Sequence, residues 1–155
     1  MTIPKTVKDI QSLTERVAAL TRFISKVTDR CAPFFKAFKG SKRSITWTAE
    51  CDQAFSELKA YMSRAPLLST PESRDVLTIY LSVSATAVSS VLIRPHDGAE
   101  HPVHYVSKGL QDAEVRYPDI EKLAFALVVS ARRLRPYFQA HTIHVLTNQP
   151  LRQML

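Results

Sequence analysis

The sequence predicts a mixed α+β or α/β protein, in which two or three helices precede three antiparallel strands, a helix and a fourth strand. Three observations predict this class. Apolar residues recur at steps of three and four near the N-terminus, alternate with polar residues after residue 76, and return to helical spacing after residue 118. The 155 residues are 45% hydrophobic and 23% charged, which is enough for one domain of ordinary size with a buried core.

Two helical patterns occupy the first part of the chain. The first covers residues 6–27, "TVKDIQSLTERVAALTRFISKV", where Thr6 and Asp9 form an N-terminal capping signature. The second covers residues 49–63, with Thr48 as the predicted N-cap. Its apolar stripe consists of Cys51, Phe55, Leu58 and Met62.

An antiparallel meander follows. Residues 77–83 alternate between apolar and polar side chains, which is typical of a half-buried strand. A second strand is predicted at 88–94 and a third at 102–107, and Asp97-Gly98 supplies the turn between them.

The last part of the chain returns to helical spacing. Residues 118–138 predict one helix with Pro118 as its first residue, and its middle is apolar on most sides, which indicates deep burial. A fourth strand is predicted at 141–147. Asn148 and Pro150 then begin a further helix.

Two blocks of this sequence resemble gypsy-type LTR retrotransposon polyproteins. Residues 45–71, "ITWTAECDQAFSELKAYMSRAPLLSTP", resemble the segment that joins polymerase to RNase H, F-x-W-x-x-x-C-x-x-A-F-x-x-L-K. Residues 101–128, "HPVHYVSKGLQDAEVRYPDIEKLAFALV", resemble the next block of the family, and residues 6–27 resemble the end of the reverse-transcriptase thumb. The segments "YLSVSATAVSSVLIR" and "VLTNQPLRQML" most resemble plant elements of the Tat/Ogre type.

The resemblance covers nearly the whole chain and implies a partial RNase H-like fold with three parts. Residues 1–40 are expected to be the helical C-terminal part of the thumb. Residues 41–74 are expected to contain the connecting helix and a proline-marked loop, and the basic loop "KGSKRS", residues 39–44, is the expected linker. Residues 75–155 are expected to form an RNase H-like domain that is inactive and truncated at its C-terminus.

The resemblance also implies which positions carried the chemistry. RNase H enzymes hold two Mg²⁺ ions with acidic side chains, because Mg²⁺ prefers hard anionic oxygens. The acidic position of the first strand falls on Ser82, that of the helix on Leu123, and that of the fourth strand on Asn148. A shifted alignment would make Glu121 a ligand, but one carboxylate carries too little charge for two metal ions. We therefore expect no catalytic residue, no metal and no cofactor.

The net charge of +7 is concentrated at the N-terminus. Residues 1–47 hold ten Lys and Arg against three acidic residues, while the rest of the chain is neutral. A basic segment indicates a polyanionic partner, although a solvated helix explains the charge equally well. In "ARRLRPYF" the alternatives are a phosphate-binding surface and a basic helix end that complements the helix dipole. The predicted duplex-backbone contacts are Lys8, Arg16, Arg22, Lys26, Lys42, Arg43, Arg132, Arg133 and Arg135.

Other site classes find little support. The pairs His101/His104 and His141/His144 lie three residues apart on predicted strands, so each pair points to opposite faces and is expected at the surface. Cys31 and Cys51 form no C-x-x-C pair and are expected in the core as reduced thiols. The sequence contains no G-x-G-x-x-G, P-loop or G-x-S-x-G motif.

Together these patterns predict a non-catalytic connection (tether) domain of a retrotransposon reverse transcriptase. Its expected partners are an RNA–DNA or DNA duplex, the polymerase domain and a downstream active RNase H domain. Two alternatives stay open, namely an RNase H with weak residual activity and an element-derived protein-interaction module. No apolar run approaches the roughly 18 residues of a membrane span, and no signal peptide is present, so we expect an intracellular protein in a cytoplasmic virus-like particle or the nucleus.

Overall fold

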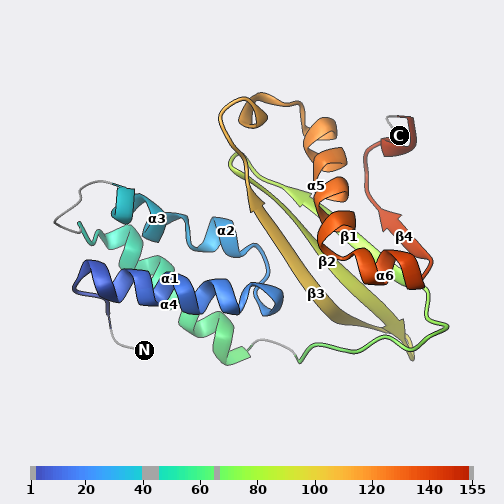
Figure 1. The fold of residues 1–155 in the computed structure, drawn as a ribbon, viewed down its shortest axis with the longest axis horizontal. Helices are drawn as coiled ribbons and strands as arrows, with labels where there is room; N and C mark the ends of the chain where they lie inside the picture. The colour runs from blue at the N-terminus through green and yellow to red at the C-terminus, as the bar shows by residue number, and fades with distance from the viewer. Residues whose placement is uncertain (1–2, 40–45, 65–66, 154–155) are drawn as a thin grey trace.

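The computed structural model describes residues 3–39, 46–64 and 67–153. A unit of four α-helices is followed by a four-stranded sheet, and one long helix packs on the sheet face opposite that unit (Figure 1). This arrangement confirms the predicted mixed class, and the described residues contain four α-helices before the sheet where two or three were expected.

The helical unit contains α1 (Val7–Ala19), α2 (Val27–Arg30), α3 (Ala32–Lys39) and α4 (Ala49–Arg64), with a 3₁₀ turn, η1 (Thr21–Phe23), after α1. The predicted capping of α1 is confirmed. Thr6 Oγ1 accepts from the Asp9 amide at 3.1 Å, and Asp9 Oδ2 accepts from the Thr6 amide at 3.0 Å, so two otherwise unpaired helix-end donors are satisfied.

The prediction of one helix over residues 6–27 is wrong, because α1 ends at Ala19. Lys26 adopts a left-handed backbone conformation with φ of 49°, which reverses the chain before α2. The reversal brings Thr28 to the sheet, where its amide donates to Ser107 Oγ at 3.2 Å. Ile24 is still fully buried, so the apolar spacing beyond Ala19 reflects burial in a compact turn rather than a continuing helix.

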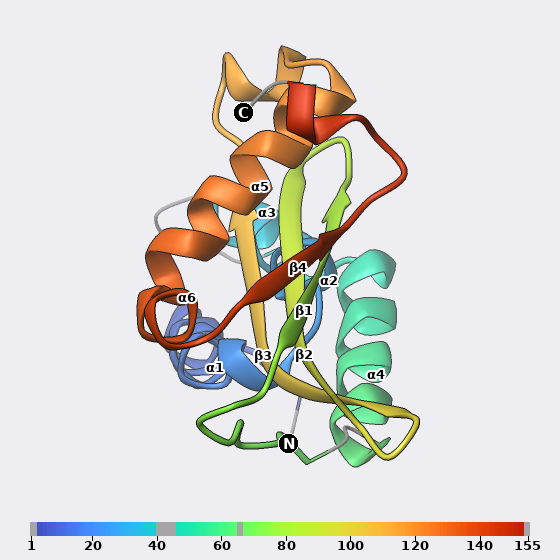
Figure 2. The ribbon, with the colours of Figure 1, turned by 90° about the vertical axis from the view of Figure 1, so that its right-hand side faces the viewer.

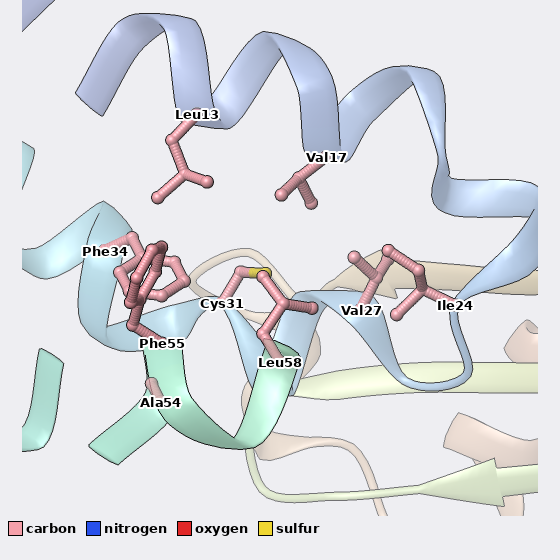
Figure 3. Packing of buried hydrophobic residues seen from close by; sticks show 9 residues of the cluster. All are labelled: Leu13, Val17, Ile24, Val27, Cys31, Phe34, Ala54, Phe55 and Leu58. Carbon is pink, nitrogen blue, oxygen red and sulfur yellow. The ribbon is translucent and has the colours of Figure 1, made fainter. Parts of the chain in front are cut away.

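Buried residues from all four helices make the core of the helical unit (Figure 3). Phe34 stacks on Trp47 with ring centroids 5.7 Å apart, and Phe55 meets both rings edge-on. The predicted N-cap of α4 is confirmed by a 3.3 Å bond from the Cys51 amide to the Thr48 hydroxyl. The cluster comprises Leu13, Val17, Ile24, Val27, Cys31, Phe34, Ala54, Phe55 and Leu58.

Both cysteines are buried, as predicted, and their thiols are free. Burial raises the pKa of the Cys31 thiol to about 11, with a smaller opposing effect from Arg30. Cys51 Sγ donates weakly to the Pro33 carbonyl at 3.5 Å, which ties α4 to α3.

The sheet contains β1 (Leu77–Val83), β2 (Ala87–His96), β3 (Ala99–Gly109) and β4 (Ile143–Leu146), in the order β3-β2-β1-β4. β1 pairs antiparallel with β2 and parallel with β4, and β2 pairs antiparallel with β3. The predicted meander is therefore confirmed. Asp97 and Gly98 have φ of 51° and 74°, the left-handed pair that a two-residue hairpin turn requires.

The helix predicted at 118–138 is two helices, α5 (Asp119–Arg133) and α6 (Arg135–Ala140). Pro136 has no N–H to donate to the carbonyl four residues earlier, so the chain turns at Leu134. Pro118 is the N-cap of α5 rather than its first residue. Val128 is 38% exposed, which corrects the expectation that the middle of this helix is buried on most sides.

One face of α5 packs against β1 and β2 (Figure 2). The buried hydroxyls of Ser130 on α5 and Ser90 on β2 lie 2.6 Å apart, and their hydrogen bond satisfies both polar groups inside an apolar layer. A short 3₁₀ turn, η2 (Glu114–Arg116), precedes α5, and another, η3 (Leu151–Gln153), stands where a further helix was predicted.

Within residues 3–39, 46–64 and 67–153, no helix has the length and apolar character needed to cross a bilayer.

Candidate nucleic-acid interface

The three positions where the resemblance places carboxylates lie on three different elements. Ser82 is half-buried on β1, and it alternates with Leu81, whose side chain packs in the cluster beneath α5. Its side chain therefore points to the other face of the sheet. There it lines a hollow of about 90 Å³ together with Lys26 and Tyr105.

The other two positions face different surroundings. Leu123 is only 6% exposed, and it lies on the face of α5 that packs on the sheet with Ala126 and Val129. Asn148 is exposed in the segment after β4. A hydroxyl, an isobutyl group and an amide thus occupy the three positions. Ser82 points away from the sheet face that α5 covers, whereas Leu123 packs from α5 onto that face. Glu121, the alternative ligand, is exposed on α5.

The histidines are dispersed over the sheet and its loops. His104 is half-buried on β3, whereas His141 lies in the loop before β4, with its Nδ1 2.9 Å from the Asp75 carbonyl. The predicted strand at 141–147 therefore starts two residues later than expected. In the part of the chain that the structure describes, no three His, Cys, Asp or Glu side chains converge in a way that could hold a metal ion.

The helical unit is joined to the sheet by polar contacts near the start of α2. Asp29 Oδ1 accepts hydrogen bonds from the Ser84 hydroxyl at 3.0 Å and the Thr86 hydroxyl at 3.1 Å, which ties α2 to the turn between β1 and β2. Thr28 bonds to β3, as described above, and its methyl group would lie 3.4 Å from a Cβ placed on Gly109.

An aromatic and cationic group makes a second junction. The Tyr61 hydroxyl of α4 accepts from the Ser25 amide at 3.0 Å, and the Arg30 guanidinium lies 4.3 Å from the Tyr61 ring centroid. Arg30 also donates to the Ser25 carbonyl at 2.8 Å. On β3, burial raises the pKa of Tyr105 to about 12, with a further contribution from Tyr61.

The predicted basic contacts divide into two groups. Lys8 and Arg16 are exposed on α1, and Arg132 and Arg135 are exposed at the end of α5 and the start of α6. Lys42 and Arg43 lie outside the described residues. The second group, Arg22, Lys26 and Arg133, lies along or near β3.

His104 on β3 has neighbours on both α6 and η1. Its ring centroid lies 6.5 Å from the Tyr137 ring on α6, and Arg22 on η1 is close enough to influence its charge. Burial lowers the pKa of His104, and the Arg22 charge lowers it further, while a hydrogen bond to the Tyr105 carbonyl acts in the opposite direction. Arg133 is exposed overall, but its Nη1 donates to the Ser107 carbonyl of β3 at 2.8 Å. One guanidinium nitrogen of this predicted phosphate contact is therefore already bound.

Sequence reasoning missed several of these residues. Arg30, Tyr61 and Tyr105 come from three distant segments, and no local pattern relates them. Lys108 was also missed, and its ammonium lies 4.9 Å from the centroid of the Phe125 ring on α5. Lys122 is 6% exposed, and its place on the apolar stripe of α5 is a signal that could have revealed its burial.

The chain is similar to retroelement polyproteins along almost its entire length. It is 28% identical over 151 residues to the retrovirus-related Pol polyprotein from transposon 297 of Drosophila melanogaster, covering 97% of this chain and 14% of that protein. The Pol polyprotein from transposon opus of the same species is also 28% identical, with 96% and 16% covered. The chain thus spans about one seventh of the length of these relatives.

Solved structures share the fold. The foamy viral protease-reverse transcriptase dRH in complex with double-stranded DNA superposes with a TM-score of 0.75 at 20% identity, over 99% of this chain and 28% of that one. The foamy viral enzyme in complex with an RNA/DNA hybrid gives 0.71 at 21% identity, over 93% and 20%.

A family model matches residues 47–145, from the segment before α4 to β4, which is well over half of the chain. That model describes the RNase H-like domain found in reverse transcriptase. Combined with the strand order β3-β2-β1-β4 and the Pol relatives, this match shows that the chain belongs to the RNase H-like domains of reverse transcriptases in retrotransposon and retroviral Pol polyproteins.

Proposed function

We propose that this chain is a non-catalytic connection domain of a retrotransposon reverse transcriptase, which scaffolds the polymerase and supports an RNA–DNA duplex. One observation carries the non-catalytic part: the four-stranded sheet is formed, yet Ser82, Leu123 and Asn148 occupy the positions that the resemblance assigns to metal-binding carboxylates. Two hydrated Mg²⁺ ions need several anionic oxygens, and these three side chains supply none.

The burial of Leu123 supports the same conclusion. A metal ligand must reach hydrated ions, whereas this side chain is 6% exposed and packs toward the sheet. Ser82 points to the other face. A partly active RNase H, the alternative from the enzyme class, would have to bind metal through Glu121 alone.

Support for duplex binding comes from relatives and from charge. The foamy viral enzymes that share this fold were solved with double-stranded DNA and with an RNA/DNA hybrid. In this chain the whole net charge of +7 lies in residues 1–47. Exposed Lys and Arg side chains on α1 and η1 suit contacts to phosphates, which give affinity without base reading.

Binding is best tested by removing charge rather than helices, since α1 to α3 share a core with α4 and a deletion would disturb it. We expect a variant with Lys8, Arg16, Arg22 and Lys26 changed to Gln to bind an RNA–DNA hybrid more weakly. Its log K against log salt slope should be smaller by about 0.9 for each phosphate that the variant no longer neutralises. The measurement is fluorescence anisotropy at several salt concentrations.

A comparison variant carries Arg132→Gln and Arg135→Gln, because these exposed residues lie at the other basic segment. It loses two charges rather than four, so the losses of affinity are compared per charge removed. If this variant loses affinity while the four-residue N-terminal variant keeps it, the interface is the end of α5, and the assignment to the N-terminal helices is wrong. Equal losses of affinity per charge removed would mean that both segments bind the duplex.

The remaining assignments are part of the same proposal. We infer an origin in a gypsy-type element, closest to the plant Tat/Ogre type, on the sequence blocks described above. The polymerase domain and a downstream active RNase H domain are the proposed partners, in a cytoplasmic virus-like particle or the nucleus. Reading the adjoining part of the parent gene tests this directly, because an intact acidic set in a second RNase H domain would support the tether role.

A further inference from the structure

β3 is an edge strand, since the sheet order is β3-β2-β1-β4. It is also long, running over 11 residues from Ala99 to Gly109. A long strand with a free edge presents a row of unpaired backbone groups, which is a template for pairing with another chain. The groups on the outer side of β3 therefore need partners or protection.

Alternate residues of an antiparallel strand bond to opposite sides. The Ser84 amide donates to the Ala87 carbonyl, so the backbone groups of Ala87 bond toward β1 and not toward its β3 partner, Gly109. Ser107 and Tyr105 lie two and four residues before Gly109, so their backbone groups also face away from β2. The outer side of β3 thus includes the carbonyls of these two residues, and the Pro102 carbonyl is also bound from outside the ladder.

Each of these three carbonyls has a donor from outside the sheet ladder. The Ser69 amide donates to the Pro102 carbonyl at 2.7 Å. His104 Nδ1 lies 3.0 Å from the Tyr105 carbonyl, so the Nδ1–H tautomer donates to it. Arg133 Nη1 donates to the Ser107 carbonyl at 2.8 Å. The donors come from a loop, from the strand itself and from α5.

Other features of β3 also oppose pairing. Pro102 has no amide to offer, and the register with β2 shifts between Leu92 and Ile93, which bends the edge. Lys108 places a charge near the end of the strand. Finally, η1 and α2 pack against β3 and cover part of it.

We infer that the outer edge of β3 is guarded against strand addition, with Arg133 and Ser69 as the donors that occupy its carbonyls. Loss of these donors turns the edge into a self-complementary surface whose partner is a second copy of this chain. Two β3 strands related by a twofold axis would pair antiparallel, which satisfies the same backbone groups in both copies. Arg133 then serves the fold in addition to any contact with phosphate.

The test compares Arg133→Ala with Arg132→Ala in the full chain. Both remove one arginine from the end of α5, but of the two only Arg133 bonds to β3 within the described residues. We expect Arg133→Ala to form a species of about twice the monomer mass as its concentration rises, measured by analytical ultracentrifugation. Hydrogen exchange should slow at the amides of Tyr105 and Ser107 in that species.

The inference is overturned if Arg133→Ala stays folded by circular dichroism and keeps the mass of the Arg132→Ala control at every concentration. It is also overturned if the wild-type chain already protects the Tyr105 and Ser107 amides through pairing. Should Arg133→Ala fail to fold, Ser69→Pro gives the same test, because it removes the amide that covers the Pro102 carbonyl. Arg133→Lys retains a donor and should behave as wild type.

Discussion

Restoring the three carboxylates is expected to destabilise the chain without creating a nuclease. The variant carries Ser82→Asp, Leu123→Glu and Asn148→Asp. Asn148 is exposed, so its change should alter the free energy of unfolding by no more than about 0.5 kcal/mol. Leu123 is 6% exposed, so its replacement loses about 1.5–3 kcal/mol of apolar burial and places an unpaired charge in the core.

The expected total loss is about 3–5 kcal/mol, a large part of the stability of an ordinary domain. Urea unfolding followed by circular dichroism measures it. Leu123→Met should cost less than about 1.5 kcal/mol, and Leu123→Gln separates the effect of polarity from that of charge. Burial raises the pKa of an introduced glutamate, so the deficit of the triple variant should shrink at pH 5.

The effect of Mg²⁺ on the stability of the triple variant shows whether the restored carboxylates form a metal site. A site that binds Mg²⁺ would recover about 2.7 kcal/mol at a free concentration 100 times its Kd. We expect no such recovery, because Ser82 and Leu123 belong to opposite faces of the sheet. Restored stability together with cleavage of an RNA–DNA hybrid would refute this account and indicate a recently lost active site.

Three further predictions follow from side chains outside these positions. Because the pKa of His104 is below its ordinary value of 6.5, the unfolded chain binds more protons than the folded chain, and the stability that depends on neutral His104 should be present above pH 6.5 and lost as the pH falls. Between pH 7.5 and 5.5, the free energy of unfolding in urea should therefore fall less in His104→Gln than in the wild-type chain. Asp29→Ala should cost about 1–3 kcal/mol, since it removes the carboxylate that accepts from both the Ser84 and the Thr86 hydroxyls, and an unchanged urea midpoint would contradict this. Cys31 should resist thiol reagents at pH 8 until urea unfolds the chain, because its pKa is about 11 and it is buried; rapid labelling of the native protein would argue against this burial.

Much of the fold could be predicted because local patterns and burial agree in the sheet. The alternation at 77–83, the Asp97-Gly98 turn and the capping box at Thr6 each have a local cause, and each is confirmed. The N-terminal helix was predicted too long, because Ile24 is buried in a turn and its spacing imitates a helix. Helix breaks that serve tertiary packing, such as the reversal at Lys26, leave no such local signal.

The candidate site was less predictable for the same reason. The identities of Ser82, Leu123 and Asn148 could be read from the sequence, but the sheet face that each one occupies could not. The bonds from Arg133 to Ser107 and from Ser25 to Tyr61 join residues 26 and 36 positions apart. Interactions over such separations depend on how the helices and strands pack together, which no sequence period encodes.

The central claim is that this RNase H-like domain holds a duplex without cutting it. One titration tests it most directly, in which the purified chain is added to a labelled RNA–DNA hybrid with Mg²⁺ or Mn²⁺, and anisotropy and RNA length are read from the same samples. The account predicts a salt-dependent rise in anisotropy with the RNA at full length. Cleavage of the RNA that increases with the concentration of the chain, and that a metal chelator prevents, would contradict it.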